Sequence, residues 1–85
     1  MFYFYLLRCQ DGTLYCGSTN NLEKRLKLHN TGRGSAYVKS RGGGEMVYSE
    51  SFATIGDAMR REIEVKKWSK AKKEKLVTSQ INENH

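Results

Sequence analysis

Proline is absent from the 85 residues of this chain, and cysteine and histidine occur only twice each. Two cysteines cannot build the disulfide framework of a small secreted domain, so we expect a protein of the reducing cytoplasm. A tetrahedral zinc site needs about four ligands. The available nitrogen and sulfur donors of this kind stand at no recognised ligand spacing: Cys9, Cys16, His29 and His85. The sequence therefore favours neither a disulfide scaffold nor a zinc module.

Long apolar runs are also missing. The most apolar stretch, MFYFYLL, covers residues 1–7 and is followed at once by Arg8. A secretory signal needs a basic start and a longer apolar core, and a membrane-spanning helix needs about 20 apolar residues. We therefore expect no signal peptide and no membrane segment.

Acidic residues are too few to balance the basic ones. Nine Asp and Glu stand against fifteen Lys and Arg, which gives a net charge of +6 and a pI of about 9.5. This surplus indicates an acidic partner, nucleic acid in the first place and an anionic membrane surface in the second. The alternative is a solvated, lysine-rich surface without a partner. The length suits one domain with a small core, which we place at residues 1–77, followed by a polar, frayed tail at 78–85.

Two strands are predicted at the start of the chain. The aromatic run at residues 2–8 predicts a buried strand, and residues 13–17 predict a second strand that forms a hairpin with it. Two loops fit the segment between them: a two-residue Asp-Gly turn, or a three-residue loop with Gly12 in the left-handed conformation. Only the longer loop pairs Tyr5 with Gly17 and puts Tyr3, Tyr5 and Tyr15 on one face of the sheet.

Capping residues and glycines mark the remaining elements. Asn20 and Asn21 precede a helical pattern at residues 22–30, the glycine-rich residues 31–44 predict a loop, and residues 45–53 predict a third strand. Thr54 opens a capping box before a helix at 55–68, and Ser69 starts a short basic helix that ends at Leu76. We therefore expect an α/β fold of order β-β-α-β-α-α, a small sandwich in which helices flank a three-stranded antiparallel sheet.

Polar side chains border the apolar faces of two predicted helices. At about 100° per residue, Arg25 and His29 share or border the stripe of Leu22 and Leu26. A rim arginine whose stem packs on the core is one interpretation, and a satisfied core histidine is the corresponding interpretation of His29.

On the predicted helix at 55–68, the polar side chain on the apolar face is Glu62. It falls near the middle of a face formed by Ile55, Ala58, Met59, Ile63 and Val65. Carboxylates are rarely buried without a partner. An i,i+4 pair with Lys66 is the structural interpretation, but an exposed pair of this kind contributes only about 0.3–0.5 kcal/mol. A cationic partner across a cleft, either a divalent metal ion or Arg25, explains the position better.

These side chains together suit phosphoryl chemistry. A guanidinium can stabilise the charge of a pentacoordinate phosphate, and one carboxylate can hold a Mg²⁺ ion that keeps several waters. A tyrosine can accept a proton if nearby cations lower its pKa. In the glycine-rich loop, Arg33, Lys39 and Arg41 are candidates for contact with a phosphate backbone, the alternative being a solvated loop.

The segments Tyr3-Phe4-Tyr5 and Tyr15-Cys16-Gly17, followed by Arg25, His29 and Glu62, resemble the motifs of the GIY-YIG nuclease superfamily. The similarity is to its small single-domain YhbQ/YazA-like branch and covers residues 2–77, including LYCGSTNNLEKRLKLHN, GSAYV and AMRREIEVKKWSKAKKEKL. Three residues depart from the motif tripeptides: Tyr3 stands for glycine, and Phe4 and Cys16 each stand for isoleucine.

The resemblance implies an endonuclease that cuts DNA with one divalent metal ion, Mg²⁺ or Mn²⁺, and no further cofactor. Tyr5 and Tyr15 would orient or deprotonate the attacking water, Arg25 would stabilise the transition state, His29 would relay a proton, and Glu62 would bind the metal. Tyr37 would be a further active-site tyrosine. Repair or recombination on branched, damaged or single-stranded DNA fits such an enzyme, and the alternative is a non-catalytic nucleic-acid-binding module that uses the same basic face.

Two neighbours of Tyr15 carry expectations of their own. Gly17 has no side chain, which suggests that a protein or nucleic-acid backbone passes close to the sheet there. Cys16 should face the core as a small hydrophobic residue.

Overall fold

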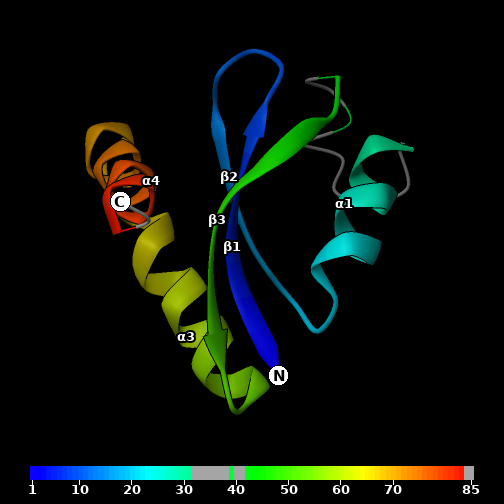
Figure 1. Ribbon diagram of the computed structural model, residues 1–85, viewed down its shortest axis with the longest axis vertical. Helices are drawn as coiled ribbons and strands as arrows, with labels where there is room; N and C mark the ends of the chain where they lie inside the picture. The colour runs from blue at the N-terminus through cyan, green and yellow to red at the C-terminus, as the bar shows by residue number, and fades with distance from the viewer. Residues whose placement is uncertain (32–38, 40–41, 84–85) are drawn as a thin grey trace.

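A three-stranded antiparallel sheet forms the centre of the computed structural model, which describes residues 1–31, 39 and 42–83. The strands are β1 (Phe2–Cys9), β2 (Leu14–Thr19) and β3 (Gly44–Phe52), in the spatial order β2-β1-β3. The helices are α1 (Leu22–Asn30), α3 (Ile55–Lys66) and α4 (Lys70–Glu83). Figure 1 shows α1 on one face of the sheet and both α3 and α4 on the other. The predicted fold class and element order are confirmed.

The hairpin uses the three-residue loop. Gly12 has a φ of +87°, and its N–H donates to the Cys9 carbonyl over 2.9 Å. This left-handed residue lets the chain turn without shifting the strands. Tyr5 therefore pairs with Gly17 and Leu7 with Tyr15, as the longer loop requires.

Local capping explains where the helices start. The Asn21 side chain accepts from the Lys24 N–H at the start of α1, and the Thr54 hydroxyl accepts from the Asp57 N–H at the start of α3. α4 continues beyond Leu76, where the sequence predicted its end, to Glu83. The segment after Leu76 has no proline or glycine to end the helix, and the hydroxyls of Thr78 and Ser79 donate hydrogen bonds to backbone carbonyls one turn earlier. The division into a domain ending at residue 77 and a tail after it stays a prediction.

The sheet separates two apolar clusters. Buried residues of the larger cluster lie between the sheet and the pair α3 and α4: Phe4, Leu6, Leu14, Cys16, Val65 and Val77. The smaller one lies under α1 and holds Tyr5, Leu7 and Cys9, with Tyr15, Leu22, Leu26 and Met46 packed against them. Cys16 is 3% exposed, so the expectation that it faces the core is confirmed.

The buried face of α3 differs from the predicted one. Ala58 and Val65 are fully buried, whereas Ile55, Met59 and Ile63 are 43%, 50% and 55% exposed. The small Ala58 side chain lets the helix backbone approach the sheet closely, and this turns the larger apolar residues outward. The prediction that Ile55, Met59 and Ile63 form core around Glu62 is therefore wrong.

Candidate active site

Tyr5, Tyr15 and His29 meet under α1. Tyr5 is fully buried, and its hydroxyl lies 2.9 Å from Nε2 of His29, which is 1% exposed. The Tyr15 ring stands edge-on to His29 with centroids 5.4 Å apart, and the centroids of the two tyrosine rings are 6.3 Å apart. The two tyrosines therefore share one face of the sheet with the histidine.

Gly17 makes room for the Tyr5 ring. The two residues are cross-strand partners, and a Cβ atom at position 17 would overlap the phenol of Tyr5. The expectation that a protein or nucleic-acid backbone passes close to Gly17 is corrected: the neighbour is the ring of the tyrosine opposite. Because any larger residue would push this ring away, Gly17 holds the Tyr5–His29 contact in place.

Burial keeps both members of that contact neutral. Desolvation raises the pKa of Tyr5 well above its ordinary value of 10, although the nearby charge of Arg25 acts in the opposite direction. Burial also lowers the pKa of His29 below its ordinary 6.5, and Arg25 lowers it further. The idea that cations lower the tyrosine pKa is therefore wrong for Tyr5, because desolvation outweighs the cation.

Glu62 lies on the other side of the sheet, at the border of the buried face of α3. Its side chain is 19% exposed. Oε1 accepts a hydrogen bond from the Ser18 hydroxyl over 2.8 Å, and Oε2 lies 2.8 Å from Nζ of Lys66. The i,i+4 pair that the sequence offered as a structural interpretation is thus formed, and Ser18 is a partner that sequence reasoning missed.

The edge strand β2 connects the two groups of side chains. Its residues alternate between faces, so Tyr15 and Gly17 point toward α1 while Cys16 and Ser18 point toward α3. Because β2 is at the edge, groups on its two faces come within electrostatic reach of each other. The charge of Glu62 adds a little to the rise that burial causes in the pKa of Tyr5, and Tyr15 adds a little to the rise that the hydrogen bond with Glu62 causes in the pKa of Lys66.

Arg25 completes the arrangement from α1, where it is half-buried one turn before His29. It borders a hollow of about 190 Å³ at the start of α1, which Thr19, Asn20, Asn21, Lys24 and Leu28 also line. Arg25 therefore lies next to accessible space at the start of α1.

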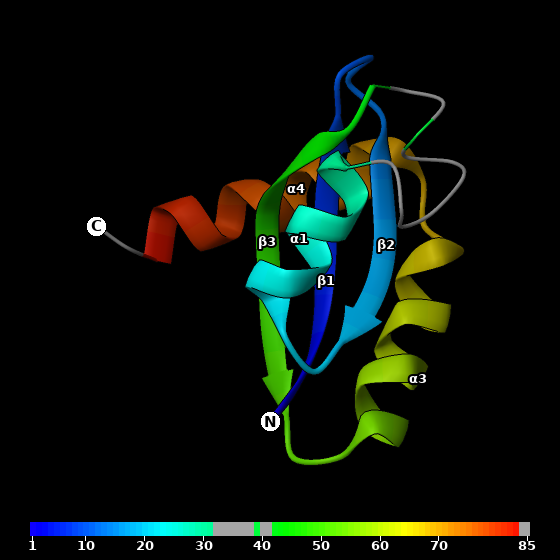
Figure 2. The same ribbon diagram turned by 90° about the vertical axis from the view of Figure 1, so that its right-hand side faces the viewer.

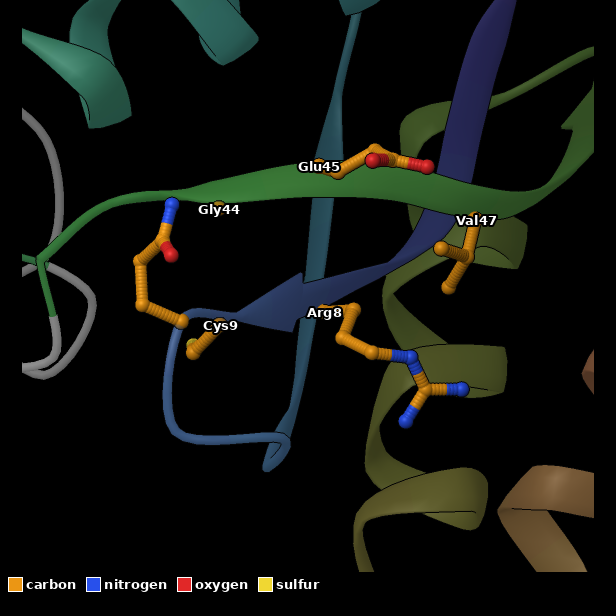
Figure 3. Close-up of a pocket in the computed structure, with 6 residues that line it drawn as sticks. Arg8, Cys9, Gly44, Glu45 and Val47 are labelled. Atoms are coloured by element: carbon orange, nitrogen blue, oxygen red, sulfur yellow. The ribbon is translucent and has the colours of Figure 1, made fainter.

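Four predicted site residues belong to the glycine-rich segment 31–44. Arg33, Tyr37 and Arg41 lie outside the described residues, and Lys39 is exposed. A larger hollow of about 330 Å³, shown in Figure 3, lies at the hairpin end of the sheet and contains none of the predicted site residues. Its lining is Arg8, Cys9, Gln10, Gly44, Glu45 and Val47.

No helix in the described part of the chain is long and apolar enough to cross a membrane.

A divalent ion at this site would have few protein ligands. In residues 1–31, 39 and 42–83 no group of three or more His, Cys, Asp and Glu side chains could hold a metal ion. Glu62 fits an ion such as Mg²⁺, which is bound through one or two carboxylates and keeps several waters. The Ser18 hydroxyl, which is hydrogen-bonded to this carboxylate, offers an additional oxygen, and Lys66, whose side chain is 53% exposed, has room to move away from Oε2.

Comparison with known proteins assigns the family. The model of the GIY-YIG catalytic domain matches residues 1–75. This chain belongs to the GIY-YIG family. Family membership supports a nuclease-type function on a nucleic-acid substrate, and GIY-YIG nucleases are in general metal-dependent.

Related GIY-YIG chains carry the name UPF0213. A UPF0213 protein of Bacillus pumilus is 49% identical over 85% of this chain and 74% of its own length. The UPF0213 protein YazA of Bacillus subtilis is 41% identical over 94% of this chain and 81% of its own. The solution structure of a UPF0213 protein from Bacillus halodurans is 42% identical, covers 92% of this chain and 84% of its own, and superposes with a TM-score of 0.58. The predicted resemblance is confirmed, and these names state no specific activity.

Proposed function

We propose that this chain is a divalent-metal-dependent endonuclease that hydrolyses DNA phosphodiester bonds. The observation that carries the proposal is the arrangement around β2. On one side of this edge strand a neutral Tyr5–His29 pair lies beside Tyr15, and on the other side Glu62 is held by Ser18. Arg25 adds a cation whose charge reaches both Tyr5 and His29.

The proposed roles follow from exposure and charge. Tyr15 is partly exposed, so its hydroxyl can orient the attacking water and take up its proton while the phenolic proton passes to His29. The neutral, buried Tyr5 orients His29 as this proton relay. The water oxygen forms a bond to phosphorus, the P–O bond of the leaving nucleotide breaks, and the leaving oxygen takes up a proton. Arg25 stabilises the additional negative charge on the phosphoryl oxygens.

Glu62 would hold one Mg²⁺ or Mn²⁺ ion, with Ser18 fixing the orientation of the carboxylate. Such an ion, when bound, supplies Lewis-acid stabilisation of phosphoryl charge. No other cofactor is part of the proposal.

The substrate and setting are proposed from charge and family. A net charge of +6 fits DNA, and branched, damaged or single-stranded forms suit a small nuclease domain in repair or recombination in the cytoplasm. Arg33, Lys39 and Arg41 are proposed phosphate contacts, and Tyr37 is proposed as an additional site residue.

The test is cleavage of supercoiled, branched and single-stranded DNA in the presence of Mg²⁺ or Mn²⁺. Glu62→Gln keeps the hydrogen-bonding shape and removes the charge, so the cleavage rate should fall by at least about 100-fold while DNA binding persists. Glu64→Gln is the matched control, since Glu64 lies on the same helix and pairs with Arg61 instead. Equal cleavage by both variants, or a wild type that never cuts, would contradict the proposal.

One observation favours a second function. The contact between Lys66 and Glu62 already neutralises the carboxylate, as expected of a module that binds nucleic acid without cutting it. That function predicts salt-sensitive DNA binding, no cleavage with either metal, and the same affinity for wild type and Glu62→Gln.

A further inference from the structure

Positive charge is concentrated where α3 ends and α4 begins. Residues 66–75, KKWSKAKKEK, contain six lysines and one glutamate, a net charge of +5 in a chain whose total is +6. The single acidic residue, Glu74, is already neutralised by Arg8, whose two guanidinium nitrogens donate to it over 2.7 and 2.5 Å. The rest of the chain is therefore close to neutral.

This basic segment lies beside the candidate active site. Lys66 contacts Glu62 directly. Burial raises the pKa of Cys16, which lies on β2 between Tyr15 and Gly17, and the charges of Lys73 and Lys66 oppose this rise, so both lysines are close to the edge strand. Figure 2 shows α3 running alongside β2 before the chain passes into α4 behind the sheet.

The local structure compensates only part of this charge. The first turn of α4 contains no acidic residue, although the positive end of a helix dipole disfavours lysine there. Lys72 is held 4.2 Å above the Trp68 ring. Within the described residues, no carboxylate lies at ion-pair distance from Lys67, Lys70 or Lys73. Crowded lysines at a helix N-terminus are unfavourable alone and become favourable when an anion binds.

We propose that Lys66, Lys67, Lys70 and Lys73, here called the lysine ridge, bind the sugar-phosphate backbone of the DNA that flanks the scissile bond. This placement rests on the proposed nuclease function, and it makes the α3–α4 junction the contact for the flanking duplex. An anionic membrane would also attract lysines, but membrane-binding surfaces combine them with apolar side chains. The exposed Ile55, Met59 and Ile63 all precede the ridge, on the earlier turns of α3.

The experiment measures binding in EDTA, so that cleavage plays no part. Fluorescence anisotropy of a short labelled DNA duplex gives the dissociation constant over a range of salt concentrations. Lys70→Gln/Lys73→Gln should weaken binding and reduce the slope of log K against log salt by about one to two, since each phosphate contact contributes about 0.9. Lys27→Gln/Arg60→Gln removes the same charge from exposed positions on the two faces of the sheet, and its slope should change by less than half as much.

Three results would overturn the proposal. The first is a wild type without salt-dependent DNA binding, and the second is an equal slope for the two variants. The third is a ridge variant that binds DNA like wild type and loses binding only to vesicles of phosphatidylglycerol and phosphatidylcholine. Thermal melting checks folding, and the ridge variant should be as stable as wild type or more stable, because it loses repulsion at the helix dipole. If wild type never cuts DNA but the slope falls as expected, the nuclease function fails and the ridge as a DNA-binding surface stands.

Discussion

The two faces of the sheet bury different kinds of side chain. Under α3 and α4 the buried residues are apolar, and charged pairs such as Arg8–Glu74 and Arg61–Glu50 close the edges. Under α1 the apolar cluster is smaller and includes a buried hydroxyl bonded to a buried imidazole. Polar groups of this kind are costly to bury and are stable only with their partners. The comparison indicates that the α3 and α4 face supplies most of the stability, whereas the α1 face holds the tyrosines and the histidine of the proposed site.

The largest expected effect is on stability at the α3 and α4 face. Leu6 is fully buried there, and Leu6→Ala should lower the free energy of unfolding by about 2–5 kcal/mol. Leu26 on α1 is only partly buried, so Leu26→Ala should lower the free energy of unfolding by clearly less than Leu6→Ala does. Denaturant unfolding measures both values, and an equal loss for the two variants would break the comparison.

Gly17→Ala tests how tightly the α1 face is arranged. The added methyl overlaps the Tyr5 ring, so unfolding should become easier by about 1–3 kcal/mol and cleavage should fall with it. Gly56→Ala is the matched control, since a Cβ there would make only ordinary van der Waals contacts, 3.8 Å from the Arg60 side chain and 3.9 Å from that of Thr54, and should stabilise the helix by up to about 1 kcal/mol. If Gly17→Ala changed neither the free energy of unfolding nor the cleavage rate, the Tyr5 ring would have room for a side chain at position 17.

The pH dependence of stability should report the buried His29. Its folded pKa is lower than its unfolded pKa, so the unfolded state binds more protons near and below pH 6.5. The free energy of unfolding should be constant above that pH and fall as the pH decreases through it, by at most about 1.4 kcal/mol per unit. The same titration of His29→Gln should lose this slope, and a slope that persists would assign it to other groups.

The smallest effect is expected on the outer face of α3. Met59 is half exposed, and Met59→Gln should change the free energy of unfolding by no more than about 0.5 kcal/mol. If α3 buried the face predicted from sequence alone, Met59 would be a core residue, and Met59→Gln would lower the free energy of unfolding by several kcal/mol. Chemical denaturation of the single variant decides between them.

Most of the fold could be predicted because local signals agree with the global arrangement. The aromatic run, the Gly12 loop and the caps at Asn21 and Thr54 each act over a few residues, and together they predict the element order and leave two hairpin registers, of which the structure has the one with the three-residue loop. The buried face of α3 could not be predicted, because its largest apolar residues face outward and a small alanine makes the contact.

The site divides in the same way. Strand alternation brings Tyr5 and Tyr15 together, and helix periodicity adds His29 beside them. The hydrogen bond from Ser18 to Glu62 depends on how α3 packs against β2, which no local pattern specifies. The raised pKa of Tyr5 depends on complete burial, which likewise becomes visible only in the folded protein.

A pair of tyrosines tests the division between the two faces most directly. Tyr15→Phe removes a hydroxyl on the α1 face, and Tyr48→Phe removes one that donates to Glu50 over 2.5 Å elsewhere on the sheet. The measurement is the DNA cleavage rate of each variant, taken where unfolding experiments show both to be folded. The predicted result is a loss of at least about 100-fold for Tyr15→Phe and an unchanged rate for Tyr48→Phe. Equal rates for the two variants, or a greater loss for Tyr48→Phe, would contradict the assignment of the water-activating hydroxyl to the α1 face.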